Sequence, residues 1–165
     1  MTGRFDDLLA ANARYADDFR FAGFDGVAHA GVAVVTCMDS RIDPLGMLGL
    51  RPGDAKMLRN PGGRVTDKVL PALVLGVTLL GVERILVVPH TRCAMATASE
   101  IELRQRVSRA SGRDASREVF GAIEDQPSTL REDVARIRAH PLVPASVAVG
   151  GFLYDVDTGR LSQLV

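Results

Sequence analysis

Two short motifs hold the residue types of a catalytic metal site. They are Cys37-Met38-Asp39-Ser40-Arg41 and His90-Thr91-Arg92-Cys93. A catalytic zinc ion takes three protein ligands, keeps a fourth position open, and accepts thiolate sulfur and imidazole nitrogen in a mixed set. Cys37, His90 and Cys93 supply such a set, so the sequence predicts one zinc ion per subunit.

Both motifs begin where an apolar, β-branched run ends. Residues 32–36 precede Cys37, and residues 85–89 precede His90. Such runs are typical of buried strands in a parallel sheet, and ligands of open α/β sheets bind at the carboxyl ends of the strands. Since we expect the two strands to be neighbours, Cys37 and His90 should converge with Cys93 on a single ion.

The charged residues of the first motif suit a catalytic pair. Asp39 follows the ligand Cys37 closely, and its carboxylate can accept a hydrogen bond from an oxygen bound to the metal. Arg41 can hold that carboxylate in a bidentate pair, which keeps it oriented and ionised because a nearby guanidinium depresses the pKa of an acid. A surface ion pair is the alternative interpretation, but these charges directly follow a buried strand.

The composition argues against several classes of protein. A chain of 165 residues that is 47% hydrophobic and 24% charged fits one compact domain, residues 1–165. The formal net charge is zero, so neither nucleic acid nor an anionic membrane is an expected partner. Acidic residues stand where a signal peptide would be basic and then apolar, and no apolar run is long enough to span a membrane. With two cysteines expected to be reduced, the sequence favours a cytoplasmic location.

Hydrophobic periodicity predicts alternating strands and helices. This pattern gives a single-domain α/β fold with a mainly parallel central β-sheet that is flanked by helices and covered on both faces, and a closing hairpin adds an antiparallel C-terminal edge strand. The expected helices are residues 5–19, 42–50 and 66–80 and two or three exposed helices within residues 100–138, and the expected strands are residues 32–36, 55–58, 84–89, 146–154 and 161–165.

The expected helix at residues 66–80 is apolar on nearly all sides. Such a helix is buried on more than one side, and a single sheet covers only one of them. The sequence therefore predicts that the other side meets a second subunit in an obligate homodimer. Pro71 lies inside this segment, where it either kinks the helix or moves its start by a few residues.

The two motifs together, Cys-x-Asp-Ser-Arg and His-x-x-Cys, resemble those of the β class of carbonic anhydrases, in particular the small bacterial type. Arg59-Asn60 with Gly62-Gly63 is similar to the Arg-Asn-Ala-Gly segment that lies beside the site in that family. The leading helix and the Gly-rich closing hairpin also match, so the likeness covers essentially the whole chain.

This resemblance implies a β-carbonic anhydrase-like fold and a carbonate dehydratase, which is a lyase. Zinc-bound hydroxide would attack carbon dioxide and give bicarbonate in a reversible hydration. A homodimer or a tetramer is also implied, in which the leading helix, residues 1–20, packs on the partner. The implied site residues are the zinc ligands Cys37, His90 and Cys93, the catalytic dyad Asp39 and Arg41, and the substrate-pocket loop residues Asn60, Gly62 and Gly63.

Three residues depart from the pattern of that family. Ala94 stands where the family usually has Gly, Arg92 where small members tend to carry Asp, and Pro61 where Ala is usual. If position 94 needs a positive φ, Ala94 is strained by about 1 kcal/mol. Pro61 is expected to stiffen or redirect the loop over the site.

Other interpretations stay open at this point. A hydrolase of carbonyl sulfide or carbon disulfide needs the same nucleophile and differs only in the shape of its pocket. A zinc protein without catalysis would use the same ligands to hold its fold. Asp39 can also bind the metal itself, giving a closed site that Arg41 opens, and the presence of Arg41 favours the open form. His29 can relay protons, although an ordinary loop histidine is the favoured interpretation.

Overall fold

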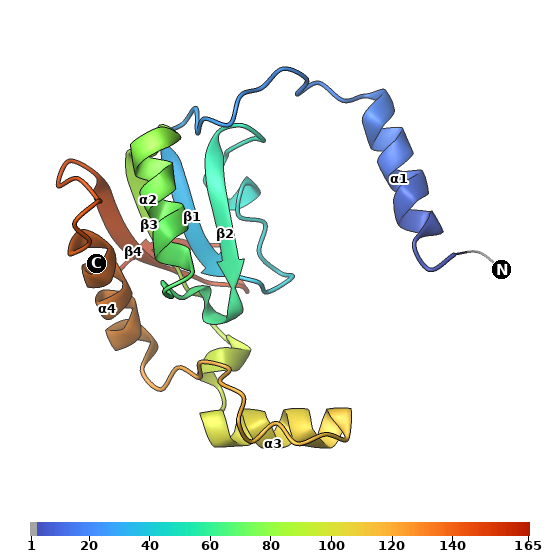
Figure 1. Ribbon diagram of the computed structural model, residues 1–165, viewed down its shortest axis with the longest axis vertical. Coiled ribbons are helices and arrows are strands. Elements are labelled where there is room, and N and C mark those ends of the chain that lie inside the picture. Colours follow the sequence, from blue (N-terminus) through green and yellow to red (C-terminus); the bar gives the residue numbers. More distant parts are fainter. Residues whose placement is uncertain (1–2) are drawn as a thin grey trace.

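A five-stranded sheet forms the centre of the molecule in the computed structural model, which describes residues 3–165 (Figure 1). Its strands are β1 (Val32–Cys37), β2 (Ala55–Asn60), β3 (Arg84–Val88), β4 (Ala148–Tyr154) and β5 (Leu161–Gln163). The strand order is β2-β1-β3-β4-β5, in which only β4 and β5 pair antiparallel. The predicted α/β fold, with a mainly parallel sheet and an antiparallel C-terminal edge strand, is confirmed.

The register brings the ends of β1 and β3 together. β1 lies between β2 and β3, and its Thr36 is paired with Val88 on one side and with Arg59 on the other. Every residue of β1 is buried. Because neighbouring parallel strands end at the same edge of a sheet, Cys37 and the loop after β3 meet there, as the sequence predicts.

Helices α2 (Val69–Leu79) and α4 (Gln126–Arg138) pack on one face of the sheet (Figure 1). The sequence predicts an exposed helix in the second of these segments, and that prediction is wrong. Leu130, Val134 and Ile137 recur at i, i+4 and i+7 and form an apolar stripe among the charges. This stripe places α4 in the core, where its first residues come close to the metal centre described below.

The other face of the sheet is covered by an irregular segment. The helix predicted at residues 42–50 is wrong, because the segment forms only a 3₁₀ turn, η1 (Gly46–Leu48), which Gly49 ends in the left-handed conformation. Glycine at both ends of so short a segment opposes a regular helix. Within residues 3–165, helices pack on one face of the sheet only, and apolar side chains of the irregular segment pack against Val34 and Val88 on the other.

Helix α2 begins a few residues later than predicted, at Val69, as the position of Pro71 requires. Pro71 lies in the first turn, where a backbone N–H has no partner within the helix, so the ring removes no helical hydrogen bond. Leu73 is buried against the sheet, whereas Leu75 and Leu79 are 51% and 69% exposed. The single chain therefore leaves part of this apolar helix uncovered.

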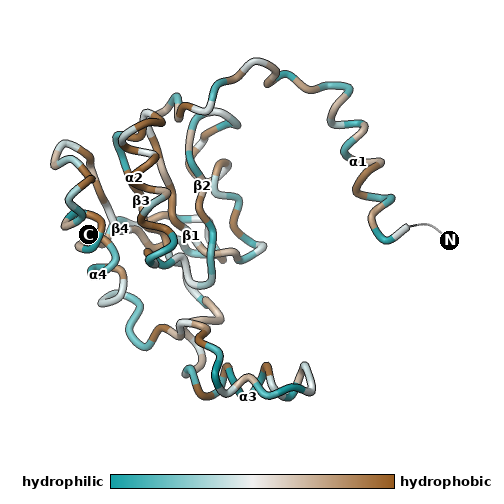
Figure 2. The backbone as a smooth tube through the Cα atoms, viewed as in Figure 1, coloured by the Kyte–Doolittle hydropathy of each residue, from teal (hydrophilic) through white to brown (hydrophobic). Residues whose placement is uncertain are grey.

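Helix α1 (Asp6–Asp17) stands away from the sheet at the end of an extended segment (Figure 1). It confirms the predicted leading helix, yet none of its residues is buried. Figure 2 shows apolar positions along its length, and Leu8 and Leu9 are 62% and 65% exposed. The chain by itself gives the apolar side of α1 nothing to pack on.

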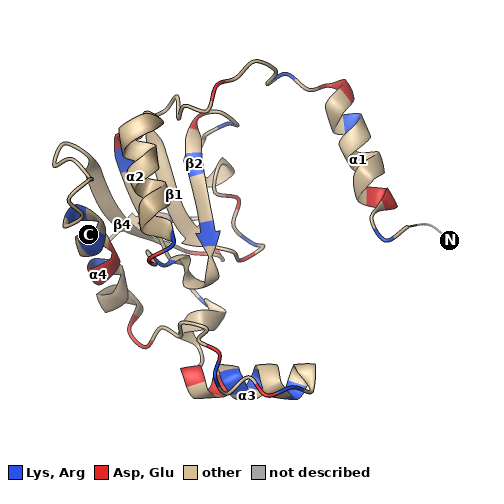
Figure 3. Ribbon diagram, viewed as in Figure 1, with Lys and Arg blue, Asp and Glu red and all other residues tan. Residues whose placement is uncertain are grey.

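Helix α3 (Glu100–Ser111) also projects from the sheet and buries none of its residues. A capping box between Ser99 and Glu102 defines its start, and Gly112 ends it in the left-handed conformation. Figure 3 shows charges of both signs on α3 and α4 and none on β1. No helix within residues 3–165 combines the length and apolar character needed to cross a bilayer.

Candidate metal centre

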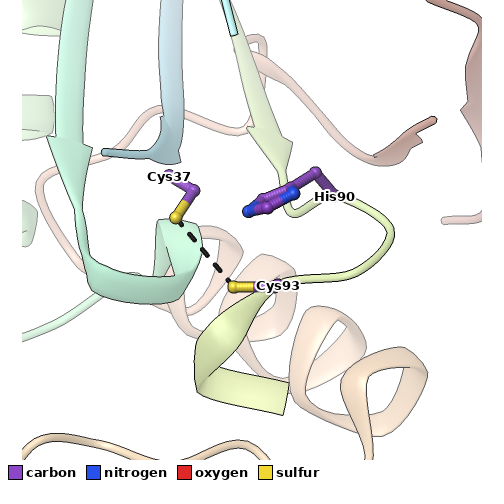
Figure 4. Close-up of side chains that lie close together, drawn as sticks. All are labelled: Cys37, His90 and Cys93. Carbon is purple, nitrogen blue, oxygen red and sulfur yellow. Dashed lines mark hydrogen bonds between the residues drawn. The ribbon is translucent and has the colours of Figure 1, made fainter. Parts of the chain in front are cut away.

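Cys37, His90 and Cys93 lie close together at the carboxyl edge of the sheet (Figure 4). Cys37 ends β1, and the other two residues come from the loop after β3. Their ligand atoms all lie within 4.8 Å of one another, and the two Sγ atoms are 4.0 Å apart. Two sulfurs at about 2.3 Å from a tetrahedral zinc would be separated by about 3.8 Å, so these side chains are spaced for one such ion.

The ring of His90 is fully buried, and only one of its nitrogens has a hydrogen-bond partner. Nδ1–H donates to the carbonyl oxygen of Thr91 at 2.8 Å, which leaves the lone pair on Nε2. Within residues 3–165, Nε2 is the only buried side-chain nitrogen or oxygen without a partner. A buried polar atom rarely stays unpaired, and metal-binding histidines are oriented through their other nitrogen in this way. Zinc fits the site because it would satisfy Nε2.

The two cysteines differ in their readiness to ionise. A hydrogen bond from the Cys93 thiol, with a smaller contribution from the Gly62 N–H, lowers the pKa of Cys37 to about 4. The same contact, together with burial, raises the pKa of Cys93. The Gly62 nitrogen lies 3.3 Å from Sγ of Cys37. The contact between the thiols therefore favours ionisation of one of them, and a bound divalent cation would displace the remaining protons.

Asp39 and Arg41 form the bidentate pair expected from the sequence. Arg41 donates from Nε to Oδ1 of Asp39 at 2.9 Å and from Nη2 to Oδ2 at 2.7 Å. These side-chain hydrogen bonds, followed by one from the Arg41 backbone N–H at 3.0 Å, hold the pKa of Asp39 well below its usual range. Oδ2 of Asp39 lies 3.8 Å from Nε2 of His90. An ionised carboxylate thus borders the three candidate ligands.

A pocket of about 280 Å³ opens beside these ligands. Apart from the two cysteines, its walls are formed by Met38, Asp39, Pro61, Ala94 and Met95. A mainly apolar lining with one carboxylate suits a small apolar molecule that must meet a polar reacting group. Of the predicted substrate-pocket loop, Pro61 lines this space, whereas the predicted residues Asn60, Gly62 and Gly63 are not among its walls.

Asn60, Gly62 and Gly63 instead shape the turn that supports Cys37. The Asn60 side chain closes the turn, because Oδ1 accepts from the Arg64 N–H at 2.8 Å and Nδ2 donates to the Arg64 carbonyl at 2.7 Å. Both glycines have positive φ. A Cβ added to Gly63 would lie 3.0 Å from the backbone nitrogen of Cys37. Glycine at position 63 therefore allows this turn to approach the end of β1 at Cys37 closely.

Replacing Gly63 with Ala is expected to lower the free energy of unfolding by about 3 kcal/mol, because the side chain is strained at positive φ and also meets the backbone of Cys37. Gly49→Ala is the matched control. Gly49 has the same kind of φ, 66°, but an added Cβ there has nothing within 4 Å, so only about 1 kcal/mol should be lost. Urea unfolding of both variants measures the difference, and equal losses would contradict the close approach.

Two further residues hold the backbone of the site. Arg59 donates from Nε to the Cys37 carbonyl at 3.0 Å and from Nη2 to the Asp39 carbonyl at 2.6 Å. Gln126, at the start of α4, donates from Nε2 to the His90 carbonyl at 3.1 Å. The position of Arg59 next to Asn60 in a recognisable motif was a signal for its importance. Nothing in the sequence near Gln126 links it to His90, because that contact depends on how α4 packs.

Comparison with known proteins identifies the family. The family profile described as carbonic anhydrase matches residues 32–161. Beta-carbonic anhydrase 1 of Mycobacterium tuberculosis is 34% identical over 162 residues, which cover 96% of each chain. This chain belongs to the β-carbonic anhydrase family. The crystal structure of carbonic anhydrase from Streptococcus mutans agrees, with a TM-score of 0.89 and 38% identity over 100% of this chain and 99% of that one.

Another similar protein is named for a different activity. Carbon disulfide hydrolase from Acidianus sp. is 31% identical over 153 residues, which cover 79% of this chain and 75% of that protein. This likeness is lower in coverage than the likeness to beta-carbonic anhydrase 1. Similarity to these relatives therefore identifies the fold more firmly than it identifies the substrate.

The three departures of this β-carbonic anhydrase from its family pattern have different outcomes. Ala94 does not have a positive φ, so the condition for strain at that position is not met. Arg92 does have one, of 54°. Pro61 begins a second 3₁₀ turn, η2 (Pro61–Gly63), and forms part of the pocket wall.

His29 lies at the opposite end of the sheet from the metal centre. It precedes β1, whereas Cys37 ends that strand. The six residues of β1 span about 20 Å at about 3.3 Å per residue. The Nε2 atom of His29 is instead 3.0 Å from Oδ1 of Asp25. His29 therefore does not relay protons to the metal centre of its own subunit, and the ordinary loop interpretation fits its position.

Proposed function

We propose that this chain is a carbonate dehydratase that binds one zinc ion per subunit and converts carbon dioxide and bicarbonate into each other. The observation that carries the proposal is the buried, unpartnered Nε2 of His90 beside two thiols, with an ionised Asp39 at 3.8 Å. A structural zinc site is usually closed by four protein ligands, whereas a catalytic site has three and an open position. Three candidate ligands next to a pocket therefore favour catalysis over a purely structural zinc.

The proposed mechanism assigns a task to each part of the site. Cys37, His90 and Cys93 would hold the zinc ion, which when bound would supply a nucleophilic oxygen from water near neutral pH. The Asp39 carboxylate borders both the candidate ligands and the pocket, so it would accept a hydrogen bond from that nucleophile and orient it toward the pocket. Arg41 keeps the carboxylate ionised and prevents its rotation, because it donates to both carboxylate oxygens. The apolar wall that includes Met38 and Met95 admits a small linear molecule and disfavours bulk water in the space that this molecule would occupy.

A hydrolase of carbonyl sulfide or carbon disulfide is the second candidate. The likeness to the carbon disulfide hydrolase from Acidianus sp. favours it, and all three substrates are small linear electrophiles. A pocket of about 280 Å³ is large enough for each of them, so its size does not choose between them. We place carbon dioxide first because the likeness to beta-carbonic anhydrase 1 spans 96% of both chains.

The substrate is decided by direct assay of the zinc-loaded protein. Stopped-flow hydration of carbon dioxide is run beside sulfide release from carbonyl sulfide and from carbon disulfide. We expect hydration and little sulfide release. Sulfide release without hydration would reverse our order of candidates. If a protein with stoichiometric zinc shows neither activity, the interpretation as a zinc protein without catalysis would be favoured.

We also propose that the chain forms an obligate homodimer, which can pair further into a tetramer. The apolar side of α1 and the outer residues Leu75 and Leu79 of α2 are exposed in the single chain. A helix of 12 residues is marginal in water by itself. Burial of these apolar surfaces against a second copy would stabilise both helices. In this arrangement α1 reaches across the partner subunit.

Leu9→Asp is expected to convert the dimer to a monomer, because it places a charge in the apolar side of α1, where Leu9 is exposed in the single chain. Analytical ultracentrifugation at micromolar concentration measures the effect. Arg14→Asp is the control, since it puts the same carboxylate about 140° around the helix, away from Leu9. A dimer that persists in Leu9→Asp would contradict a role of α1 in association.

We place the protein in the cytoplasm. Cys37 and Cys93 are free thiols, and both must stay reduced to bind zinc. A reducing compartment keeps cysteines in that state. Fractionation of cells that produce the protein checks this location.

A further inference from the structure

Arg92 has a backbone conformation that residues other than glycine avoid. Its φ is 54°, and every other residue with a positive φ within residues 3–165 is a glycine. Such strained residues persist where their surroundings hold them, and they gather at functional sites. Arg92 lies between the candidate ligands His90 and Cys93, in the short loop that brings both to one point.

The carbonyl group of Arg92 contacts the catalytic pair. Arg41 donates from Nη2 to this carbonyl at 3.3 Å and to Oδ2 of Asp39 at 2.7 Å. The guanidinium group of Arg41 is thus held by Asp39 and by the loop that contains His90 and Cys93. If Arg41 turns away from Asp39, it loses both contacts, so the position of the Arg92 carbonyl bears on the orientation of the dyad.

The β4–β5 hairpin holds the loop that contains Arg92. The Arg92 side chain forms an ion pair with Asp157, which lies between β4 and β5. The neighbouring Thr91 donates its N–H to the Tyr154 carbonyl at 2.9 Å, and its Oγ1 accepts from the Val156 N–H at 3.1 Å. Because the side chains of Arg92 and Asp157 are 60% and 59% exposed, their ion pair is weak, and it restrains the loop only in part, beside the two contacts that Thr91 makes with the hairpin backbone.

The carboxylate of Asp39 has an alternative position close by. Its Oδ2 lies 3.8 Å from Nε2 of His90, one of the three candidate ligand atoms. A carboxylate released by Arg41 can therefore reach a metal held by those ligands and occupy the open position. Carboxylate oxygen is an ordinary ligand for zinc.

We propose that Arg92, held by Asp157, is a positioning residue that keeps Arg41 on Asp39 and thereby keeps the metal centre open. The inference rests on the proposed zinc-dependent function, and it adds the β4–β5 turn to the parts of the fold that control the site. The left-handed turn at Arg92 aims the carbonyl, and the ion pair restrains the turn. Neither residue needs to touch the substrate.

Azide binding to the cobalt-loaded protein tests the proposal, because azide needs an open metal position and the visible absorption of Co²⁺ reports its binding. Asp157→Asn removes the charge of the ion pair, and Arg92→Gly removes the side chain without adding strain at positive φ. We expect both variants to bind azide roughly two- to fivefold more weakly than the wild type, as the loss of an exposed ion pair allows. Adding Asp39→Asn to each variant should restore azide binding, since the amide lacks the charge with which Asp39 competes for the metal.

The controls separate this effect from a general disturbance. Asp25→Asn removes another exposed carboxylate, which contacts His29 away from the metal centre, and should leave azide binding unchanged. Unchanged affinity in both Asp157→Asn and Arg92→Gly would overturn the proposal, as would a loss that Asp39→Asn does not restore. Azide binding needs no turnover, so a protein that shows these effects but does not hydrate carbon dioxide would refute the proposed function alone.

Discussion

Zinc-loaded Asp39→Asn protein is expected to hydrate carbon dioxide about 10²–10⁴ times more slowly than the wild type, while it keeps its zinc. Asp39 accepts hydrogen bonds from Arg41 on both of its oxygens, at 2.9 and 2.7 Å. An amide has only one oxygen, so its NH₂ group must either face the Arg41 donors or face the nucleophile. In both cases the site loses the charged acceptor that orients the nucleophile, whereas the three candidate zinc ligands are untouched.

Stopped-flow rates and zinc content must be measured on the same preparations of this variant. Asp114→Asn is a suitable control, because Asp114 is an exposed carboxylate whose only hydrogen-bond donor among the described residues 3–165 is Ser116. We expect that control to keep the wild-type rate. Full activity in Asp39→Asn would refute the role of the dyad, and loss of zinc would instead make Asp39 a metal ligand.

His90→Gln is expected to weaken zinc binding by more than the roughly 100-fold that changes in the surroundings of a metal site can cause, and to abolish hydration. The fully buried imidazole offers an unpartnered Nε2 between two thiols. Glutamine provides an amide oxygen in place of that nitrogen, which suits zinc poorly in a set dominated by sulfur. Zinc content after dialysis and competition with a chromogenic chelator measure the loss.

The chain contains three histidines, so the other two are matched controls for this substitution. His29→Gln and His140→Gln should retain stoichiometric zinc, since neither side chain belongs to the candidate metal cluster. His29→Gln should also keep the wild-type hydration rate, because His29 lies at the far end of β1. Zinc loss from either control would place a ligand outside the three residues proposed here, and zinc retention in His90→Gln would refute the ligand set.

Sequence periodicity was a poorer guide where charges or glycines compete with the apolar pattern. In residues 126–138 the many charged side chains favour the prediction of an exposed helix, although Leu130, Val134 and Ile137 form an apolar stripe that packs against the sheet. In residues 42–50 the apolar spacing resembles that of a helix, but the glycines permit only a 3₁₀ turn. The first error arises because packing against the sheet, and not local charge, decides which helix is buried. The second arises because the local glycines outweigh the apolar spacing.

Local order along the chain is enough to predict which residues meet at the metal centre. Two buried, β-branched strands carry Cys37 at the end of one and His90 just after the other, and neighbouring parallel strands end at one edge of a sheet. The bidentate geometry of Asp39 and Arg41 also follows from their short separation, since both lie on one loop. These features depend on local order along the chain and on one topological rule, so the linear pattern contains them.

The orientations of those residues depend on how the folded chain packs. The free Nε2 of His90 depends on where the Thr91 carbonyl lies, and the left-handed turn at Arg92 depends on contacts with the β4–β5 hairpin. The hydrogen bond from Gln126 to the His90 carbonyl depends on the position of α4. The contacts of Arg92 and Gln126 join elements that are far apart in the chain, and the Thr91 backbone beside His90 is held by Tyr154 of β4. Residue spacing carries no information about these orientations, so they appear only once the chain has folded.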